Sequence, residues 1–253
     1  MCIKTKVFLI FFLILSFVFS VKEANAIIYF SDNFDENNLD NWTFIADSSD
    51  QESWKIIDQQ LVGEVTNGGF SFLLAKSFWD LSDYSIRFDS LNKSGVDQDI
   101  VFRVSEDRNK FYLLNLRFND SLWPQDGGEI VLWKYDSSAG YKRLSTFNSL
   151  DQIELTQNDV HKIRIEVLNS NIKAYFDSTL VVDIDDETNP ILTGSFGFYN
   201  WGGNYYQRST KNLFDNLIVG DFIYDDVEVP IARSKIIILP GLGASWNLLQ
   251  QNF

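Results

Sequence analysis

The 253-residue chain has one cysteine, one histidine and few basic residues, with 21 Lys and Arg against 35 Asp and Glu. A single cysteine, Cys2, excludes an intrachain disulfide and a Cys-based zinc cluster, and a single histidine excludes a His-rich metal site. A formal net charge of −14 with no basic block leaves no positive footprint for phosphates. These shortages exclude nucleic acid as a partner. What remains is an acidic, aromatic-rich chain with ample material for a globular core.

The first 26 residues have the features of an export signal. Lys4 and Lys6 form a basic start, residues 7–21 are an apolar run too short to span a bilayer comfortably, and the segment ends in Ala24-Asn25-Ala26. The pattern predicts a signal peptide over 1–26, cleaved after Ala26, and a secreted protein with no membrane span after cleavage. The alternative is a retained N-terminal anchor.

Residues 27–219 alternate between apolar and polar positions in short runs rich in Val, Ile, Phe, Tyr and Trp. Clusters of Gly, Asn, Asp and Ser separate the runs, which is typical of antiparallel β-strands, and no stretch shows a helical period. The spacing predicts an all-β fold, a two-sheet antiparallel β-sandwich or jelly roll. The strands are expected at 84–88, 99–105, 111–118, 130–135, 161–168, 172–177, 195–199 and 213–219.

Several short segments of this region together resemble concanavalin A-like lectin/glucanase jelly rolls, and most closely the laminin-G-like and sugar-binding modules of secreted enzymes. The segments are Asp32-Asn33-Phe34-Asp35, Val101-Phe102-Arg103, Asn109-Lys110-Phe111-Tyr112-Leu113, His161-Lys162-Ile163-Arg164-Ile165-Glu166, Gly194-Ser195-Phe196-Gly197-Phe198-Tyr199 and Phe214-Asp215-Asn216-Leu217. The resemblance implies a sandwich with one concave face, often used for carbohydrate, and sometimes a structural calcium ion.

Candidate sugar-binding residues are aromatic side chains in loops and polar side chains on strands, because rings stack on pyranose faces and polar groups fix the hydroxyls. The candidates are Trp123, Trp201, Tyr205, Tyr206, Arg103 and Asn115. The alternative is that most of these aromatics are packing, as is expected for Trp42, Trp54 and Trp79.

The sequence contains candidates for two further sites, one catalytic and one for metal. The acidic run Asp183–Glu187 is the nearest match to the paired carboxylates of a glucanase, but it leads into Thr188-Asn189-Pro190 and is interpreted as a turn. For Ca²⁺ the resemblance points to Asp32 and Asp215, on the first and last strands, with turn caps as the alternative. His161 lacks an accompanying Ser or Cys motif and is expected to be a strand-end histidine rather than a catalytic group.

The last 34 residues differ in character from the sandwich region. Residues 220–234 are acidic and predict a linker, and 235–239 is a continuous apolar run followed by Pro240-Gly241-Leu242-Gly243. This short stretch resembles the start of a lipase-like α/β-hydrolase domain, 235–253. The resemblance implies an oxyanion-hole loop at Gly241 and Leu242. No Gly-x-Ser-x-Gly elbow occurs, so the chain is expected to be a fragment without catalytic machinery of its own.

The hypothesis from the sequence is a secreted carbohydrate-binding module that targets a lipase-like hydrolase to a polysaccharide or cell-surface glycan. One alternative is an adhesion or spacer domain without a sugar site. Another is a glycoside hydrolase of the same fold.

Overall fold

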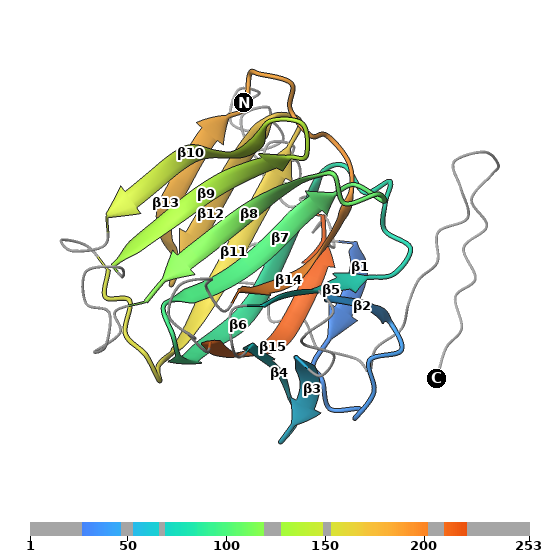
Figure 1. Ribbon diagram of the computed structural model, residues 1–253, viewed down its shortest axis with the longest axis vertical. Coiled ribbons are helices and arrows are strands. Elements are labelled where there is room, and N and C mark those ends of the chain that lie inside the picture. Colours follow the sequence, from blue (N-terminus) through green and yellow to red (C-terminus); the bar gives the residue numbers. More distant parts are fainter. Residues whose placement is uncertain are drawn as a thin grey trace, which may run out of the picture.

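The computed structural model describes residues 27–46, 53–65, 69–118, 128–148, 153–201 and 210–221. These residues form two packed antiparallel sheets and contain no helix (Figure 1). It follows that no helix within this part of the chain could cross a membrane. The predicted all-β, two-sheet antiparallel sandwich is confirmed.

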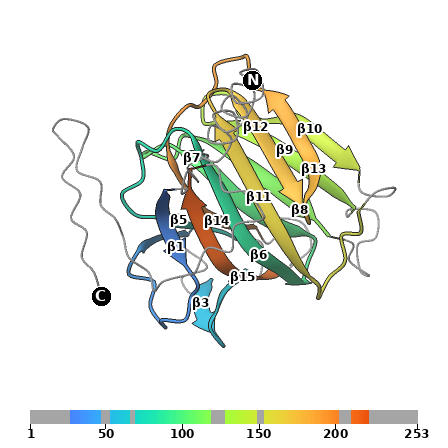
Figure 2. The same ribbon diagram turned by 180° about the vertical axis from the view of Figure 1, so that it is seen from behind.

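The eight-stranded sheet has the order β13-β12-β11-β6-β15-β4-β3, with β1 also paired to β15. It lies in front in Figure 2. Its strands are β1 (Ile28–Asp32), β3 (Trp54–Ile57), β4 (Gln60–Val65), β6 (Tyr84–Ser94), β11 (Val160–Leu168), β12 (Asn171–Phe176), β13 (Thr179–Asp185) and β15 (Thr210–Gly220).

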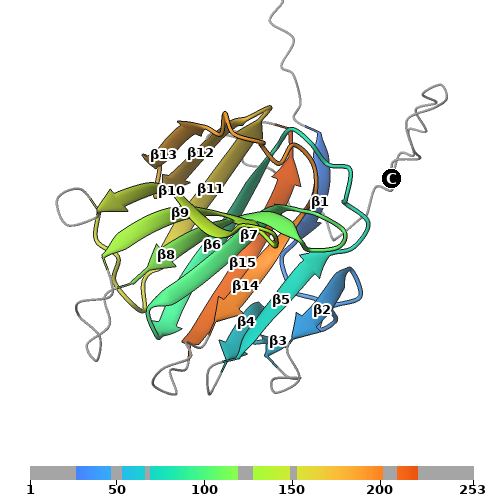
Figure 3. The same cartoon turned by 45° about the horizontal axis from the view of Figure 1, so that its top comes forward.

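The seven-stranded sheet has the order β10-β9-β8-β7-β14-β5-β2 and lies in front in Figure 1. Its strands are β2 (Trp42–Ala46), β5 (Phe70–Ala75), β7 (Asp97–Val104), β8 (Lys110–Arg117), β9 (Glu129–Asp136), β10 (Gly140–Asn148) and β14 (Ser195–Trp201). Figure 3 shows β9 and β10 as one layer over β12 and β13 as the other.

Tight turns between neighbouring strands are made by residues that tolerate positive φ. Asn169 lies between β11 and β12 with φ 52°, as its residue type predicts, and Asp177 and Ser178 join β12 to β13 with φ 45° and 68°. These hairpins place sequence neighbours side by side, whereas β14 and β15 insert between strands from distant parts of the chain.

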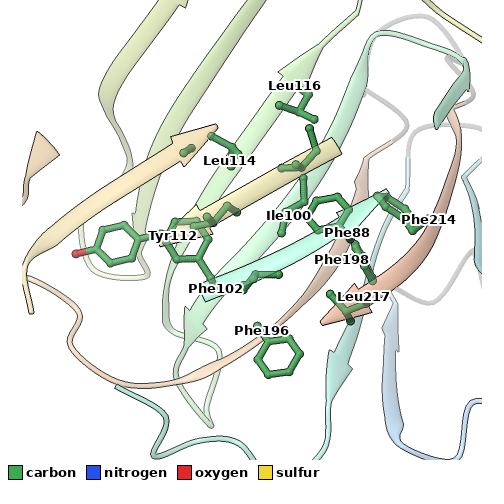
Figure 4. Packing of buried hydrophobic residues seen from close by; sticks show 14 of the residues in the cluster. Phe88, Ile100, Phe102, Tyr112, Leu114, Leu116, Phe196, Phe198, Phe214 and Leu217 are labelled. Atoms are coloured by element: carbon green, nitrogen blue, oxygen red, sulfur yellow. The ribbon is translucent and has the colours of Figure 1, made fainter. Parts of the chain in front are cut away.

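Aromatic side chains from both sheets fill the core between them. Phe198 of β14 stacks on Phe214 of β15 with ring centroids 4.1 Å apart, and Phe88 of β6 meets Phe198 edge-on at 5.6 Å (Figure 4). Trp42 and Trp54 are buried in the same cluster, as the sequence predicted. Because alternate residues of each strand enter this core, the intervening residues of the seven-stranded sheet face away from it wherever the alternation is unbroken.

Candidate functional site on the outer face of the seven-stranded sheet

We use the name "open face" for the side of the seven-stranded sheet that points away from the core. Strand register aligns Phe72, Tyr199, Asp99 and Asn115 across β5, β14, β7 and β8 in one row. The open face includes Phe70, Phe72, Asp97, Asp99, Val101, Phe111, Leu113, Asn115, Arg117, Glu129, Val131, Trp133, Tyr135, Tyr141, Arg143, Tyr199 and Trp201. It combines aromatic rings with carboxyl, amide and guanidinium groups.

The open face is concave. The rings of Phe72 on β5 and Phe111 on β8 have centroids 5.6 Å apart, although β14 and β7 lie between their strands. The hydroxyls of Tyr141 on β10 and Tyr199 on β14 also form a hydrogen bond across several strands. Side chains from distant strands can meet in this way only when the sheet curves around them. The concave face that the family resemblance implied is therefore present.

A carboxyl pair joined by an amide lies near the middle of the open face. Asn115 Nδ2 donates to Asp97 Oδ1 at 3.1 Å and to Asp99 Oδ1 at 2.6 Å. Asp99 is only 3% exposed. Burial, and then the neighbouring Asp97 carboxylate, raise the pKa of Asp99 well above its usual value. The site therefore contains a carboxyl group that accepts a proton more readily than an ordinary aspartate.

Beside this pair runs a row of alternating charges. Arg117 forms an ion pair with Glu129 and lies 3.6 Å from Asp97, and Arg143 lies 3.7 Å from Glu129. Both arginines of the open face thus contact carboxylates. Among the described residues, no ion pair joins Asp99 to either arginine of the face.

An aromatic group covers the β9–β10 end of the open face. Tyr135 and Tyr141 have ring centroids 4.7 Å apart, Trp133 meets Tyr141 edge-on at 6.4 Å, and the Arg143 guanidinium lies 4.9 Å from the Trp133 ring. Tyr141 is 51% exposed, and Trp133 is half-buried. We call Trp133, Tyr135 and Tyr141 the aromatic platform.

Two of the predicted sugar-binding residues lie on the open face. Asn115 bridges the carboxyl pair, as described above. Trp201 ends β14 opposite Phe70 and is 38% exposed. The structure therefore brings these two residues to one surface. Trp123, Tyr205 and Tyr206, also predicted to bind sugar, lie outside the described residues, as do Gly241 and Leu242 of the predicted oxyanion-hole loop.

Arg103 does not lie on the open face, contrary to the prediction. A bulge in β7, where Ser195 pairs with Val104 but Gly197 with Val101, breaks the alternation, and Arg103 has φ 49°. Its side chain turns into the protein and is 0% exposed. The guanidinium donates to the carbonyl oxygens of Ser82 at 3.0 Å and Ile191 at 2.9 Å. Arg103 therefore holds two connecting segments together.

The two carboxylates predicted to bind calcium accept hydrogen bonds from neighbouring backbone N–H groups, Asp32 at the end of β1 and Asp215 at an irregularity within β15. Asp32 is buried, and its two oxygens accept from Phe34 N and Trp42 Nε1, each at 2.9 Å. Asp215 Oδ1 accepts from Asn216 N at 2.7 Å. The first and last strands are neighbours, as expected, but no group of three or more His, Cys, Asp or Glu residues in the described chain could hold a metal. Both residues accept backbone N–H groups, as the alternative to a calcium site expected, and no metal site is shown at either of them.

His161 and the acidic run from Asp183 are the remaining titratable residues for which the sequence carried an expectation. His161 lies at the start of β11, and its Nδ1 is 2.7 Å from Asp177 Oδ2, remote from the open face. The acidic run from Asp183 lies at the end of β13, as predicted, and leads out of the strand. Its residue Asp186 is buried, however, and accepts from Lys134 Nζ at 2.6 Å. This part of the acidic run is therefore not a solvated surface turn.

Sequence reasoning missed Asp99, Trp133 and Tyr141, which belong to the most distinctive parts of the open face. The available signal was alternation: Asp97 and Asp99 share a parity with Val101, and Trp133 shares one with Tyr135. Strand alternation places such residues on one face, but it does not say which face is open. Which face is open depends on how β14 pairs between β5 and β7.

The fold resembles several solved structures that the chain covers almost completely. The carbohydrate-binding module CBM66 from Bacillus subtilis is 19% identical, with TM-score 0.55, over 72% of this chain and 96% of that one. The catalytic domain of an endo-1,3-beta-glucanase (laminarinase) from Thermotoga petrophila is 10% identical, with TM-score 0.58, over 78% and 98%. The VIP36 exoplasmic/lumenal domain, in a form bound to Ca²⁺ and Man3GlcNAc, is 11% identical, with TM-score 0.58, over 80% and 92%.

These likenesses confirm the expected concanavalin A-like jelly roll at the level of the fold. No curated protein sequence matches the chain. A family model does match, and it covers most of the sequence. Because that match extends over residues 29–217, which includes both sheets, the chain belongs to the family of 3-keto-alpha-glucoside-1,2-lyase-like domains.

Proposed function

We propose that this domain binds carbohydrate on the open face of its seven-stranded sheet. The observation that carries the proposal is the aromatic platform, solvent-exposed at Tyr141, on the same concave surface as Asp99 and Asn115. The family and the carbohydrate-binding module among the similar structures support the same class of ligand.

The chemistry of the open face suits a sugar ring. Trp133 and Tyr141 offer flat apolar surfaces to the C–H face of a pyranose or furanose, and Arg143 over Trp133 holds the indole in place. Asp99 and Asn115 provide acceptors for hydroxyl groups in a partly dry environment, where such hydrogen bonds are strong. Trp201, at the end of β14, would extend the contact along the sheet.

The test is glycan binding measured by calorimetry with the neutral polysaccharides laminarin and levan. Trp133→Ala and Tyr141→Ala should each weaken binding about tenfold, equivalent to about 1.4 kcal/mol. Tyr175→Ala is the matched control, because Tyr175 is also half-buried beneath an arginine, with Arg164 at 3.9 Å, but lies on the outer face of the other sheet. Equal losses in all three variants would refute the proposed site.

A second candidate function is cleavage of a glycosidic linkage, favoured by the buried carboxyl of Asp99 next to Asp97. Carboxyl pairs of this kind serve as acid and base in glycoside cleavage, and burial, together with the Asp97 carboxylate, raises the pKa of Asp99 and so favours its protonated form. If Asp99 protonates a leaving group, Asp99→Asn should abolish product release from laminarin or a 3-keto-glucoside while sugar binding persists. Absence of any release by the unaltered protein would eliminate this candidate and leave binding unaffected.

We also propose that the domain is exported by residues 1–26 and directs a lipase-like hydrolase, beginning near residue 235, to its glycan. These segments lie outside the described residues, and the family match ends at residue 217. N-terminal sequencing of the exported protein should begin at Ile27. A Gly-x-Ser-x-Gly elbow encoded downstream would support the hydrolase, and its absence would refute it.

A further inference from the structure

The charges of the open face limit which carbohydrates it can accept. Among the described residues, the face carries three carboxyl groups, Asp97, Asp99 and Glu129, and two guanidinium groups, Arg117 and Arg143. In the described chain, both guanidiniums contact carboxylates, Arg117 contacting Glu129 and Asp97 and Arg143 contacting Glu129. An incoming anion would have to displace one of these carboxylates to reach a cation.

The ion pairs are shielded from solvent to different degrees. The side chains of Asp97 and Glu129 are 13% and 18% exposed, and that of Arg117 is 25% exposed. A carboxylate freed from Arg117 would therefore stay close to both the arginine and the new anion. Repulsion between like charges at such a position opposes binding. Asp99, which forms no ion pair among the described residues, adds to that repulsion whenever it is ionised.

The aromatic platform also favours a neutral sugar. Stacking on Trp133 and Tyr141 requires the apolar C–H face of a sugar and no charge. The formal net charge of −14 over the whole chain also repels polyanions at a distance when salt is low.

We infer that Asp97 and Glu129 are specificity-determining residues that make the open face selective for neutral glycans and exclude uronate-containing and sulfated ones. They do so by occupying Arg117 and Arg143, the two cations that an acidic sugar would need. This inference rests on the proposed sugar-binding function and names its ligand class.

The experiment compares neutral with acidic polysaccharides by calorimetry, at about 20 mM and about 500 mM NaCl. Laminarin and levan are the neutral probes, and polygalacturonate and heparin are the acidic ones. The unaltered protein should bind a neutral glycan with little salt dependence and an acidic glycan at least about tenfold more weakly. Equal or tighter binding of either acidic glycan would overturn the inference while supporting the open face as a sugar site.

A double variant that neutralises the two carboxylates tests their role directly. Asp97→Asn with Glu129→Gln keeps the size of both side chains but leaves Arg117 and Arg143 without their carboxylate partners. It should gain binding to polygalacturonate by about tenfold at low salt and lose that gain at high salt. Asp183→Asn with Glu166→Gln, on the outer face of the other sheet, is the control for the change in net charge.

The outcomes separate the two proposals. No gain in the Asp97/Glu129 variant, or an equal gain in the control pair, would overturn the specificity inference. Failure of the unaltered protein to bind any of the four glycans would overturn the proposed function, and this inference with it.

Discussion

The two sheets of this sandwich have outer faces of different character. The outer face of the eight-stranded sheet carries exposed or half-buried ion pairs, such as Lys173 with Asp183 at 3.8 Å and Arg164 with Glu166 at 3.3 Å. The open face of the seven-stranded sheet carries the aromatic platform and the Asp97–Asn115–Asp99 group. Both faces meet solvent in a protein of one fold, so the fold does not require this difference. The difference is what the proposed sugar-binding function predicts.

The same kind of contact, an arginine over an aromatic ring, occurs on both faces. Arg143 lies over Trp133 on the open face, and Arg164 lies over Tyr175 on the other. On the open face the ring adjoins further aromatic rings and a concave surface, whereas Tyr175 has Glu166 as a neighbour, its hydroxyl donating at 3.4 Å. An isolated cation–π pair is thus ordinary surface packing, and its surroundings decide whether it can serve a ligand.

The largest expected effect comes from breaking the bulge that separates the open face from the interior. Arg103→Ala removes a fully buried side chain and leaves the carbonyl oxygens of Ser82 and Ile191 without their guanidinium donor. The free energy of unfolding should fall by roughly 3 kcal/mol, measured by urea denaturation. Arg87→Ala, a half-buried position on the outer face of β6, should change it by less than about 1 kcal/mol. A similar loss in both variants would contradict the role given to Arg103.

Next in size is the loss of glycan binding in Trp133→Ala and Tyr141→Ala, about tenfold each, with Tyr175→Ala unchanged. Urea denaturation of all three variants should show that each still folds. If the loss of binding correlated with loss of stability and not with position on the open face, the two faces would not differ in function.

A smaller effect is expected from the pH dependence of stability. Burial raises the pKa of Asp99 in the folded protein, so the folded state holds its proton to higher pH than the unfolded state does. At low pH the group is protonated in both states and does not oppose folding. As pH rises toward and through the raised pKa, the unfolded state ionises first and the free energy of unfolding falls. Asp99→Asn should flatten this fall and stabilise the protein at pH values above the raised pKa. Urea midpoints at a series of pH values would show it, and an unchanged slope would argue against the buried acid.

The smallest effect should come from the ion pairs of the eight-stranded sheet. Lys173→Met removes the partner of Asp183, and both side chains are more than one-third exposed. Such pairs contribute about 0 to 1 kcal/mol, so the unfolding free energy should change by less than about 0.5 kcal/mol, and glycan binding should not change. A larger change in the unfolding free energy or in glycan binding would mean that this face contributes to stability or to ligand binding.

Much of the fold could be predicted from local pattern. Alternation located the predicted strands within a few residues, and Asn169 gave a hairpin that the structure contains. The strands β2 to β5, β10 and β13 were not among the predicted ones, and β1 was expected only as a first strand carrying Asp32. β10 contains Lys142 and Arg143 among its exposed positions, and β13 is bulged next to Leu180, so neither shows clean alternation.

The candidate site was predicted only in part. Asn115 and Trp201 were found from residue type and position, whereas Arg103 was misplaced because a bulge reverses the face of every residue beyond it. The carboxyl pair was missed because paired acids were sought at another spacing, in the run from Asp183. The sequence does contain Asp97 and Asp99 at alternate positions, but their proximity to Asn115 depends on the β7–β8 register.

The amino-acid sequence by itself determined the class of this protein: acidic, β-rich, aromatic, without the cysteines or histidines for a metal cluster. These properties follow from composition and from a period of two residues, which are local. Tertiary structure alone decided which side of each strand is open, that Phe72 and Phe111 meet across a curved sheet, and that Asp99 is enclosed. These features depend on pairing between strands far apart in the chain, and no local preference encodes that pairing.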